Sequence, residues 1–150
     1  MDCSERRREP GFPSGAAPAA QEGIVMKYRE LYRTAQQVVQ YAYAPYSRFK
    51  VGAALLTKSG EVFTGVNVEN SSFGATICAE RTAFVKAISE GHREFDAIAV
   101  ISSDGEVYPC GICRQFMFEF GDDLKIITGE DEDHLNIKEI KELLPEGFRL

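Results

Sequence analysis

Three of the four cysteines and one glutamate have the types and spacing needed for metal-dependent hydrolysis. Glu80 follows Cys78 by two positions, and Cys113 follows Cys110 by three. Thiolates bind Zn²⁺, and a zinc site with only three protein ligands keeps a coordination position for water, as catalytic sites do. Bound zinc lowers the pKa of that water to roughly 7, and a nearby carboxylate can then move protons. The pattern predicts Cys78, Cys110 and Cys113 as zinc ligands and Glu80 as the catalytic proton shuttle.

Each thiol-bearing segment opens a predicted helix. Apolar spacing favours helices over residues 77–90 and 110–120, and each follows an extended segment. Free N–H groups and the positive end of the helix dipole at an N-terminus favour the thiolate form that zinc binds. Cys110 and Cys113 can converge on one ion, whereas Cys78 must reach it from the neighbouring helix.

The remaining elements predict a layered α/β fold with a mixed sheet, because a hairpin is followed by alternating helices and strands. The expected elements are a helix over 28–43, strands over 51–57, 62–68, 97–101 and 124–128, and a last helix carrying Ile137, Ile140, Leu143 and Leu144. Residues 1–25 are rich in Gly and Pro with few apolar groups, which predicts a disordered tail before a single domain over 26–150.

The net charge and the lack of long apolar runs disfavour several classes of partner. The net charge is −6, from 17 basic and 23 acidic residues, so a nucleic-acid partner is disfavoured and a small-molecule substrate is favoured. No apolar run approaches about 18 residues, so no membrane-spanning segment is expected. The first 25 residues lack the apolar stretch of a signal peptide, which favours a cytoplasmic protein whose cysteines bind metal or act in catalysis.

Other interpretations of the cysteines and histidines remain open from the residues alone. A lone Cys-x-x-C pair is also typical of a redox protein or of half a zinc ribbon. The ribbon needs a second pair, and the remaining cysteines, Cys3 and Cys78, are not paired. Cys3 is expected to be a free thiol in the tail. His92 and His134 lie in polar segments and are expected to be solvated rather than metal ligands.

With both cysteine segments in view, the sequence resembles the cytidine deaminase family, whose zinc signature includes a three-cysteine form. The resemblance spans about residues 28–148, and its motifs lie at 45–47, 49–54, 67–70, 78–83, 109–113 and 142–145. It implies a three-layer α/β/α sandwich around a mixed five-stranded sheet, and a homotetramer. The implied activity is hydrolytic deamination of cytidine and deoxycytidine to uridine and deoxyuridine, with release of ammonia, in pyrimidine salvage.

The resemblance also implies roles for individual residues. Asn67 and Glu69 lie two apart on a strand, face the same side, and would hydrogen-bond the sugar hydroxyl. Phe49 would pack against the pyrimidine ring, and the segment around Ala79 would hold the base carbonyl. Arg81 would donate to the cysteine sulfurs and offset the charge of −1 that three thiolates leave on Zn²⁺.

One departure from the family and several alternatives accompany this interpretation. Many family members carry a tyrosine in the loop before the Cys-Ala-Glu motif, and here Phe73 is nearest that position. The alternatives are a deaminase of a cytosine-nucleoside antibiotic and a catalytically inert zinc-stabilised binding module. Asn67 and Glu69 favour an ordinary ribose over the antibiotic, and Glu80 favours an active enzyme. The net charge disfavours editing of polynucleotides.

Overall fold

A five-stranded sheet forms the centre of the protein. The computed structural model describes residues 18–150 of the chain. The strands are β1 (Val51–Thr57), β2 (Val62–Val66), β3 (Phe95–Ser102), β4 (Lys125–Asp131) and β5 (His134–Glu139). Their order is β2-β1-β3-β4-β5, and only the pair β3 and β4 is parallel. The predicted mixed sheet is therefore confirmed.

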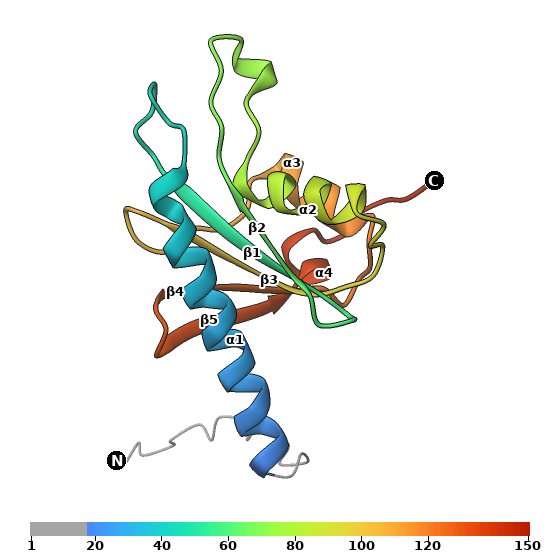
Figure 1. Ribbon diagram of the computed structural model, residues 1–150. Coiled ribbons are helices and arrows are strands. Elements are labelled where there is room, and N and C mark those ends of the chain that lie inside the picture. The colour runs from blue at the N-terminus through green and yellow to red at the C-terminus, as the bar shows by residue number, and fades with distance from the viewer. Residues whose placement is uncertain (1–17) are drawn as a thin grey trace, which may run out of the picture.

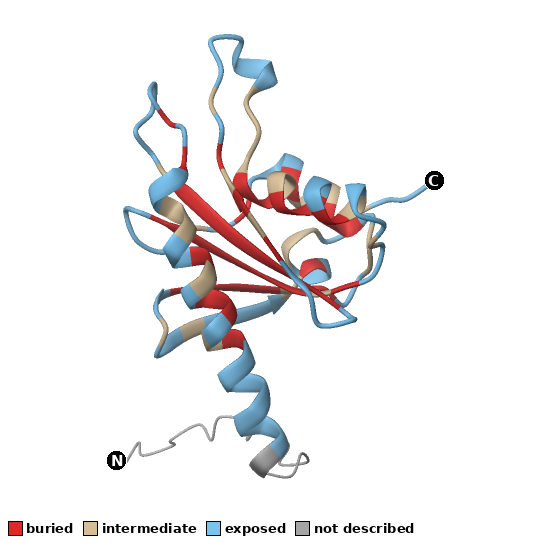
Figure 2. Cartoon of the chain, in the orientation of Figure 1, coloured by how far each residue is buried: buried red, intermediate tan, exposed pale blue. Residues whose placement is uncertain are grey.

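Helices cover both faces of this sheet, which gives the predicted three layers (Figure 1). The helices are α1 (Pro18–Val38) on one face, and α2 (Ala79–Ser89), α3 (Gly111–Phe118) and α4 (Ile140–Leu143) on the other. Two single 3₁₀ turns, at Val39–Tyr41 and Phe73–Ala75, complete the helical elements of the described residues. In Figure 2 the buried residues follow the sheet and the inward sides of the helices.

Strand β1, which lies inside the sheet, is apolar without interruption because both of its faces are covered. Every residue of β1 is buried. Ala53 and Leu55 contact the core beneath α2 and α3, while Ala54 and Leu56 contact the core beneath α1. A strand covered on both faces has no solvated side, so the alternation of polar and apolar residues disappears.

A glycine on β2 lets α2 lie directly against the sheet. A Cβ on Gly65 would overlap the carbonyl oxygen of Ala79 and come within 2.5 Å of the Ala83 nitrogen. Only glycine allows this approach without displacing helix backbone. The first turn of α2, which carries Cys78 and Glu80, is thereby held close to the sheet.

The prediction that the last helix includes Ile137 is wrong. His134–Glu139 is strand β5, and helix α4 comprises only Ile140–Leu143. Ile137 pairs with Ile127 of β4, so a hairpin ladder takes the backbone hydrogen bonds that a helix would have used. The sequence spacing of Ile137 and Ile140 matched a helical period by coincidence across this junction.

Helix α1 starts earlier than expected from the sequence. It begins at Pro18 instead of Tyr28 and gives way to a 3₁₀ turn after Val38. Residues 20–27 are exposed, and Tyr28 is buried. Residues 1–17 of the predicted tail, Cys3 included, lie outside the described residues. None of the helices in residues 18–150 has the length and apolarity that crossing a bilayer requires.

Candidate active site

Two helix N-termini bring the three thiols together. Cys78 is the N-cap of α2, Cys110 is the N-cap of α3, and Cys113 is buried in the first turn of α3. The sulfurs of Cys78 and Cys110 are 3.8 Å apart, and all three sulfurs lie within 4.8 Å of one another. Zinc–sulfur bonds of about 2.3 Å in a tetrahedron place sulfurs about 3.8 Å apart. The three thiols therefore fit one zinc ion.

The surroundings of Cys78 favour its thiolate. A hydrogen bond from Cys113 is the largest influence, and with further bonds from Arg81 and Cys110 it lowers the pKa of Cys78 to about 5. The same bond to Cys78, together with burial, raises the pKa of Cys113. A negative charge thus already gathers on the sulfurs, as a cation site requires.

Glu80 lies beside these thiols in a site shielded from water. Its residue is only 4 % exposed. Burial is the main cause that raises the pKa of Glu80 to about 7, and the charge of Cys78 adds to the effect. A carboxyl group that titrates near neutral pH can both accept and donate a proton, which suits general acid–base chemistry.

Arg81 is directed at the sulfurs. Its Nη2 donates to Cys78 Sγ at 3.4 Å. Its Nε is buried and, among the described residues, has no acceptor. A buried donor left without an acceptor is costly, so its place beside three thiols fits a site where negative charge gathers.

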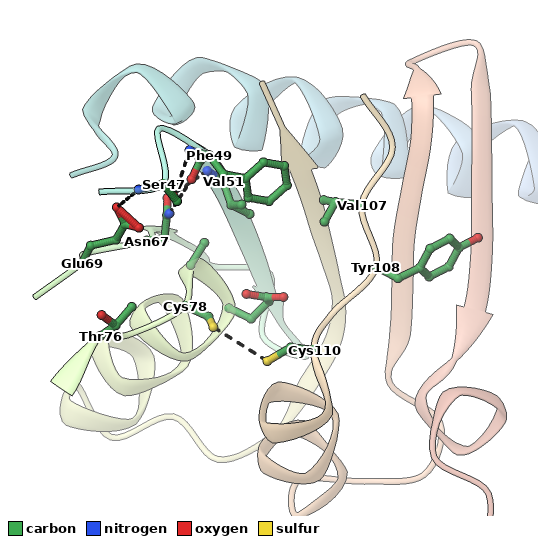
Figure 3. A pocket seen from close by; sticks show the side chains of 12 residues that line it. Ser47, Phe49, Val51, Asn67, Glu69, Thr76, Cys78, Val107, Tyr108 and Cys110 are labelled. Carbon is green, nitrogen blue, oxygen red and sulfur yellow. Dashed lines mark hydrogen bonds between the residues drawn. The ribbon is translucent and has the colours of Figure 1, made fainter. Parts of the chain in front are cut away.

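A pocket of about 240 Å³ opens over the thiols and the glutamate (Figure 3). Its lining consists of Ser47, Phe49, Val51, Asn67, Glu69, Thr76, Cys78, Ala79, Glu80, Val107, Tyr108 and Cys110. Figure 3 shows Ser47, Asn67 and Glu69 together on one side and Cys78 and Cys110 on another. The pocket therefore joins the thiols that fit a zinc ion to a group of polar side chains.

The amide of Asn67 also braces the segment that carries Phe49. Its Oδ1 accepts from the Val51 nitrogen at 2.8 Å, and its Nδ2 donates to the Phe49 carbonyl at 2.7 Å. One hydrogen of Nδ2 is left for another partner. Asn67 thus fixes Phe49 at the pocket before any contact with a ligand.

Glu69 closes the neighbouring loop in a similar way. Its Oε1 accepts from the backbone nitrogens of Tyr46 and Ser47 at 3.0 and 3.1 Å. The bond from the Ser47 backbone is the main cause that lowers the pKa of Glu69. Both bonds use Oε1, so Oε2 remains available at the pocket.

Ala79 and Phe73 differ in their relation to the pocket. Ala79 is fully buried and lines it from the first turn of α2. Phe73 is 79 % exposed, does not line the pocket, and lies with its ring centroid 6.2 Å from that of Tyr46.

The two histidines lie against carboxylates away from the thiol group. His92 Nε2 lies 2.8 Å from Glu61, and His134 Nδ1 lies 2.8 Å from Asp131. Neither belongs to the group of side chains in the described residues that could share a metal ion.

Several lining residues escaped the sequence analysis. They are Ser47, Val51, Thr76, Val107 and Tyr108. Val107 and Tyr108 stand directly before the Pro109 and Cys110 of the zinc motif, so their closeness in sequence to a ligand was an available signal. Ser47 and Val51 lie in the motifs at 45–47 and 49–54 but were given no role of their own, and Thr76 directly follows the turn at Phe73–Ala75.

The site has the parts of a hydrolytic metal centre: thiols for a zinc ion, a buried carboxyl near neutrality and a pocket for a small molecule. The fold and site therefore define a zinc-dependent hydrolase.

Known proteins with similar sequences and structures identify the family. The family model for the "cytidine and deoxycytidylate deaminase zinc-binding region" matches residues 25–129. The chain is 62 % identical over 90 residues to a "probable cytidine deaminase" of Dictyostelium discoideum, covering 59 % of this chain and 61 % of that protein. It is 48 % identical over 125 residues to a cytidine deaminase of Halalkalibacterium halodurans, covering 82 % and 95 %. A cytidine deaminase crystal structure from Burkholderia pseudomallei superposes with a TM-score of 0.75 at 46 % identity, covering 79 % and 97 %.

The chain belongs to the family of cytidine and deoxycytidylate deaminases that this zinc-binding region defines. Zn²⁺ is accordingly its metal, and the thiols of Cys78, Cys110 and Cys113 are the group that fits it.

Proposed function

We propose that the protein converts cytidine and deoxycytidine to uridine and deoxyuridine by hydrolysis, with release of ammonia. The observation that carries the proposal is the buried carboxyl of Glu80, with its pKa raised to about 7, in the same pocket as the thiols that fit zinc. An inert zinc-stabilised module has no need of a buried carboxyl there. The relatives reported above are cytidine deaminases, which supports the same reaction.

In the proposed mechanism, zinc when bound supplies a Lewis acid that activates water for attack on C4 of the ring. Glu80 takes the proton that the water loses and delivers it to N3. Attack on C4 makes that carbon tetrahedral, and Glu80 then passes the second water proton to the amino group. Ammonia leaves with the electrons of the C4–N bond, and a C4 carbonyl remains. Arg81 offsets the negative charge of the sulfurs during these steps.

Recognition of a free nucleoside is supported by the charge of the pocket. Glu69 Oε2 and the remaining hydrogen of Asn67 Nδ2 can bind a sugar hydroxyl. None of the described residues that line the pocket is a lysine or arginine, and Glu69 is acidic. A phosphate group would meet a carboxylate instead of a cation, so an unphosphorylated substrate is favoured. Phe49 would pack on the pyrimidine, and the backbone at Ala79 would hold its carbonyl.

Assembly and cellular role complete the proposal. Exposed aromatic side chains surround the pocket loops, namely Tyr41 at 72 %, Tyr43 at 57 %, Tyr46 at 53 % and Phe73 at 79 % exposure. Such a concentration favours an interface between copies, and we propose a homotetramer.

We further propose a cytoplasmic enzyme of pyrimidine salvage, with a catalytic domain over 26–150 and a dispensable tail over 1–25. The exposure of residues 20–27 and the burial of Tyr28 support this boundary.

The decisive experiment compares purified wild-type protein with the Glu80→Ala variant on cytidine. The wild type should release uridine and ammonia, and the variant should lose activity by about 10²- to 10⁴-fold, the usual range for a proton-transfer group. Zinc content by metal analysis should be equal in both, because the three thiols remain. More than a few per cent of wild-type activity in the variant would refute the role of Glu80.

The same assay separates the remaining alternatives. If the wild type ignores cytidine but deaminates a cytosine-nucleoside antibiotic, that substrate class replaces the nucleosides. If it turns over neither, the inert binding module is the better interpretation. Light scattering of the active enzyme tests the tetramer.

A further inference from the structure

The loop between β3 and α3 carries part of the pocket wall and then delivers a thiol to the zinc site. Val107 and Tyr108 line the pocket, and Cys110 follows shortly after. In Figure 3 this loop runs past Val107 and Tyr108 to Cys110, and the ring of Tyr108 points away from the other lining side chains. The side chain that this loop offers to a ligand is therefore Val107, and its position depends on what holds the loop.

Both ends of the loop are anchored by hydrogen bonds. Near its start, the Ser102 hydroxyl donates to the Gly105 carbonyl at 2.7 Å. At its end, Arg114 of α3 donates to the Pro109 carbonyl at 2.8 Å. The second anchor fixes the residue directly before the metal ligand. The middle of the loop has to be held separately.

Glu106 reaches from the middle of the loop to the sheet. Thr128 of β4 and Asn136 of β5 face each other in the antiparallel register. The Thr128 hydroxyl and the Asn136 amide both donate to one oxygen, Glu106 Oε1, at 2.7 and 2.6 Å. Thr128 is fully buried, so it is a rigid partner. These bonds, with that from Asn136 the largest influence, also lower the pKa of Glu106.

The two hydrogen bonds from Thr128 and Asn136 are strengthened by the negative charge of the Glu106 carboxylate. Hydrogen bonds to an ionised carboxylate are roughly twice as strong as those between neutral groups. Glu106 is itself exposed, and its further hydrogen bond, which also lowers its pKa, is with Tyr108, whose ring points away from the other side chains that line the pocket. Its effect on a ligand must therefore pass through the backbone to its neighbour, Val107.

We propose that Glu106 is a positioning residue for substrate binding, which fixes Val107 at the pocket through its bonds to Thr128 and Asn136. The inference rests on the proposed deaminase function and adds to it a residue outside the reacting group. Val107 would touch the substrate in the ground state and the transition state alike, so the loss of its position should raise KM with little change in kcat. Arg114 anchors the residue before Cys110 independently, so zinc binding should be unaffected.

The test compares Glu106→Ala and Glu106→Gln with the wild type. The alanine variant should raise the KM for cytidine about tenfold and leave kcat within about threefold, the signature of lost uniform binding. Zinc content should not change. Glutamine keeps an oxygen that accepts both hydrogen bonds, so Glu106→Gln should return KM to within about twofold of the wild type. Asp104→Ala is the matched control, because Asp104 is exposed on the same loop and its carboxylate contacts only the adjacent Ser103 among the described side chains.

Hydrogen exchange gives a readout that does not depend on activity. The backbone amides of residues 103–110, of which Pro109 has none, should exchange about tenfold faster in the zinc-loaded alanine variant, because the middle of the loop opens more often. The glutamine and Asp104→Ala variants should exchange like the wild type.

Two results would overturn the inference in an enzyme that deaminates cytidine: a wild-type KM in Glu106→Ala, or a Glu106→Gln variant as impaired as the alanine variant. If the wild-type protein does not deaminate cytidine, the proposed function fails instead. The exchange measurement then decides the inference, and unchanged exchange over 103–110 in Glu106→Ala overturns it.

Discussion

Glu80 and Arg81 are neighbours on α2, and their side chains bring groups of opposite charge to the same sulfurs. Glu80 is a carboxyl whose pKa is raised mainly by burial, and the charge of Cys78 adds to the effect. Arg81 brings a positive charge to the same sulfur and keeps a buried Nε without an acceptor in the described residues. Three thiolates on Zn²⁺ carry a net charge of −1, and donors to the sulfurs reduce the charge that reaches the metal.

Replacement of this guanidinium should therefore weaken the reaction without removing any group that reacts. We expect Arg81→Gln to lower kcat/KM by about 10- to 100-fold, the usual effect of losing a hydrogen bond to a metal ligand. Steady-state kinetics on cytidine and zinc analysis measure the effect. Lys138→Gln is the control, because it removes a positive charge from the exposed strand β5. A kcat/KM within twofold of wild type in Arg81→Gln would show that the sulfur contact has no catalytic consequence.

At the scale of elements, the approach of α2 to β2 sets the position of the catalytic turn. Gly65 leaves no space for a Cβ because backbone atoms of Ala79 and Ala83 lie against it. Gly65→Ala should cost about 1–3 kcal/mol of the free energy of unfolding, as overpacking does. Because the first turn of α2 must move away from the sheet, kcat/KM for cytidine should fall as well. Urea unfolding and kinetics measure the two effects.

The matched control for this substitution is Gly23→Ala on α1. Nothing lies within 4 Å of a Cβ at Gly23, and the residue is exposed in a helix. Alanine is favoured over glycine at such a position by roughly 0.5–1 kcal/mol, so this variant should be neutral or more stable than the wild type. A Gly65→Ala protein as stable and active as Gly23→Ala would contradict the close approach of α2.

Elements whose signals are local could be predicted from the sequence, and those that depend on distant partners could not. Helices α2 and α3 agree with the predicted ranges to within about two residues, the usual uncertainty of helix ends. Strand β5 was missed because its identity comes from pairing with β4, which spacing along the chain does not reveal. The early start of α1 was missed because glycine and proline near residues 10–23 were weighed more than its helix-forming neighbours.

The same division applies to the site. Cys78, Cys110, Cys113 and Glu80 were recognisable because their residue types and spacing are unusual, and the structure brings all four together. Val107 is an ordinary residue type, and its only signal in the sequence is its closeness to Cys110. Its place at the pocket depends on the loop path between β3 and α3, which tertiary contacts determine.

At the scale of the whole molecule, one ion-pair group links the sheet edge to the last helix. Glu139, at the junction of β5 and α4, pairs with Lys125 of β4 and with Lys141 of α4. The Lys125 and Lys141 bonds, in that order, lower the pKa of Glu139 from 4.5 to about 2. A lowered folded-state pKa means that the ionised group stabilises the folded protein above its unfolded value near 4.5, and that this stabilisation is lost as the pH falls toward 2.

The Glu139→Gln variant should therefore be less stable than the wild type at neutral pH, and the difference should shrink as the pH falls through this range. Glutamine retains an oxygen for the cap of α4, so the comparison isolates the charge. The difference should be small and should decrease in 1 M salt, because the group is solvent-accessible and a Debye length of about 3 Å screens it. Urea unfolding from pH 7 to pH 3 measures it, and zinc release at acid pH affects both proteins alike.

The control for Glu139→Gln is Glu119→Gln, which replaces an exposed carboxyl that forms no ion pair with the described residues. Its effect on stability at neutral pH should be near zero. A Glu139→Gln deficit that stayed constant from pH 7 to pH 3 could not come from an ionised carboxylate, because below about pH 4.5 the unfolded wild-type chain binds a proton at Glu139 that the folded protein does not, and this reduces the stabilisation. Such a deficit would instead assign the contribution of Glu139 to the cap of α4, whose hydrogen bonds do not require the charge.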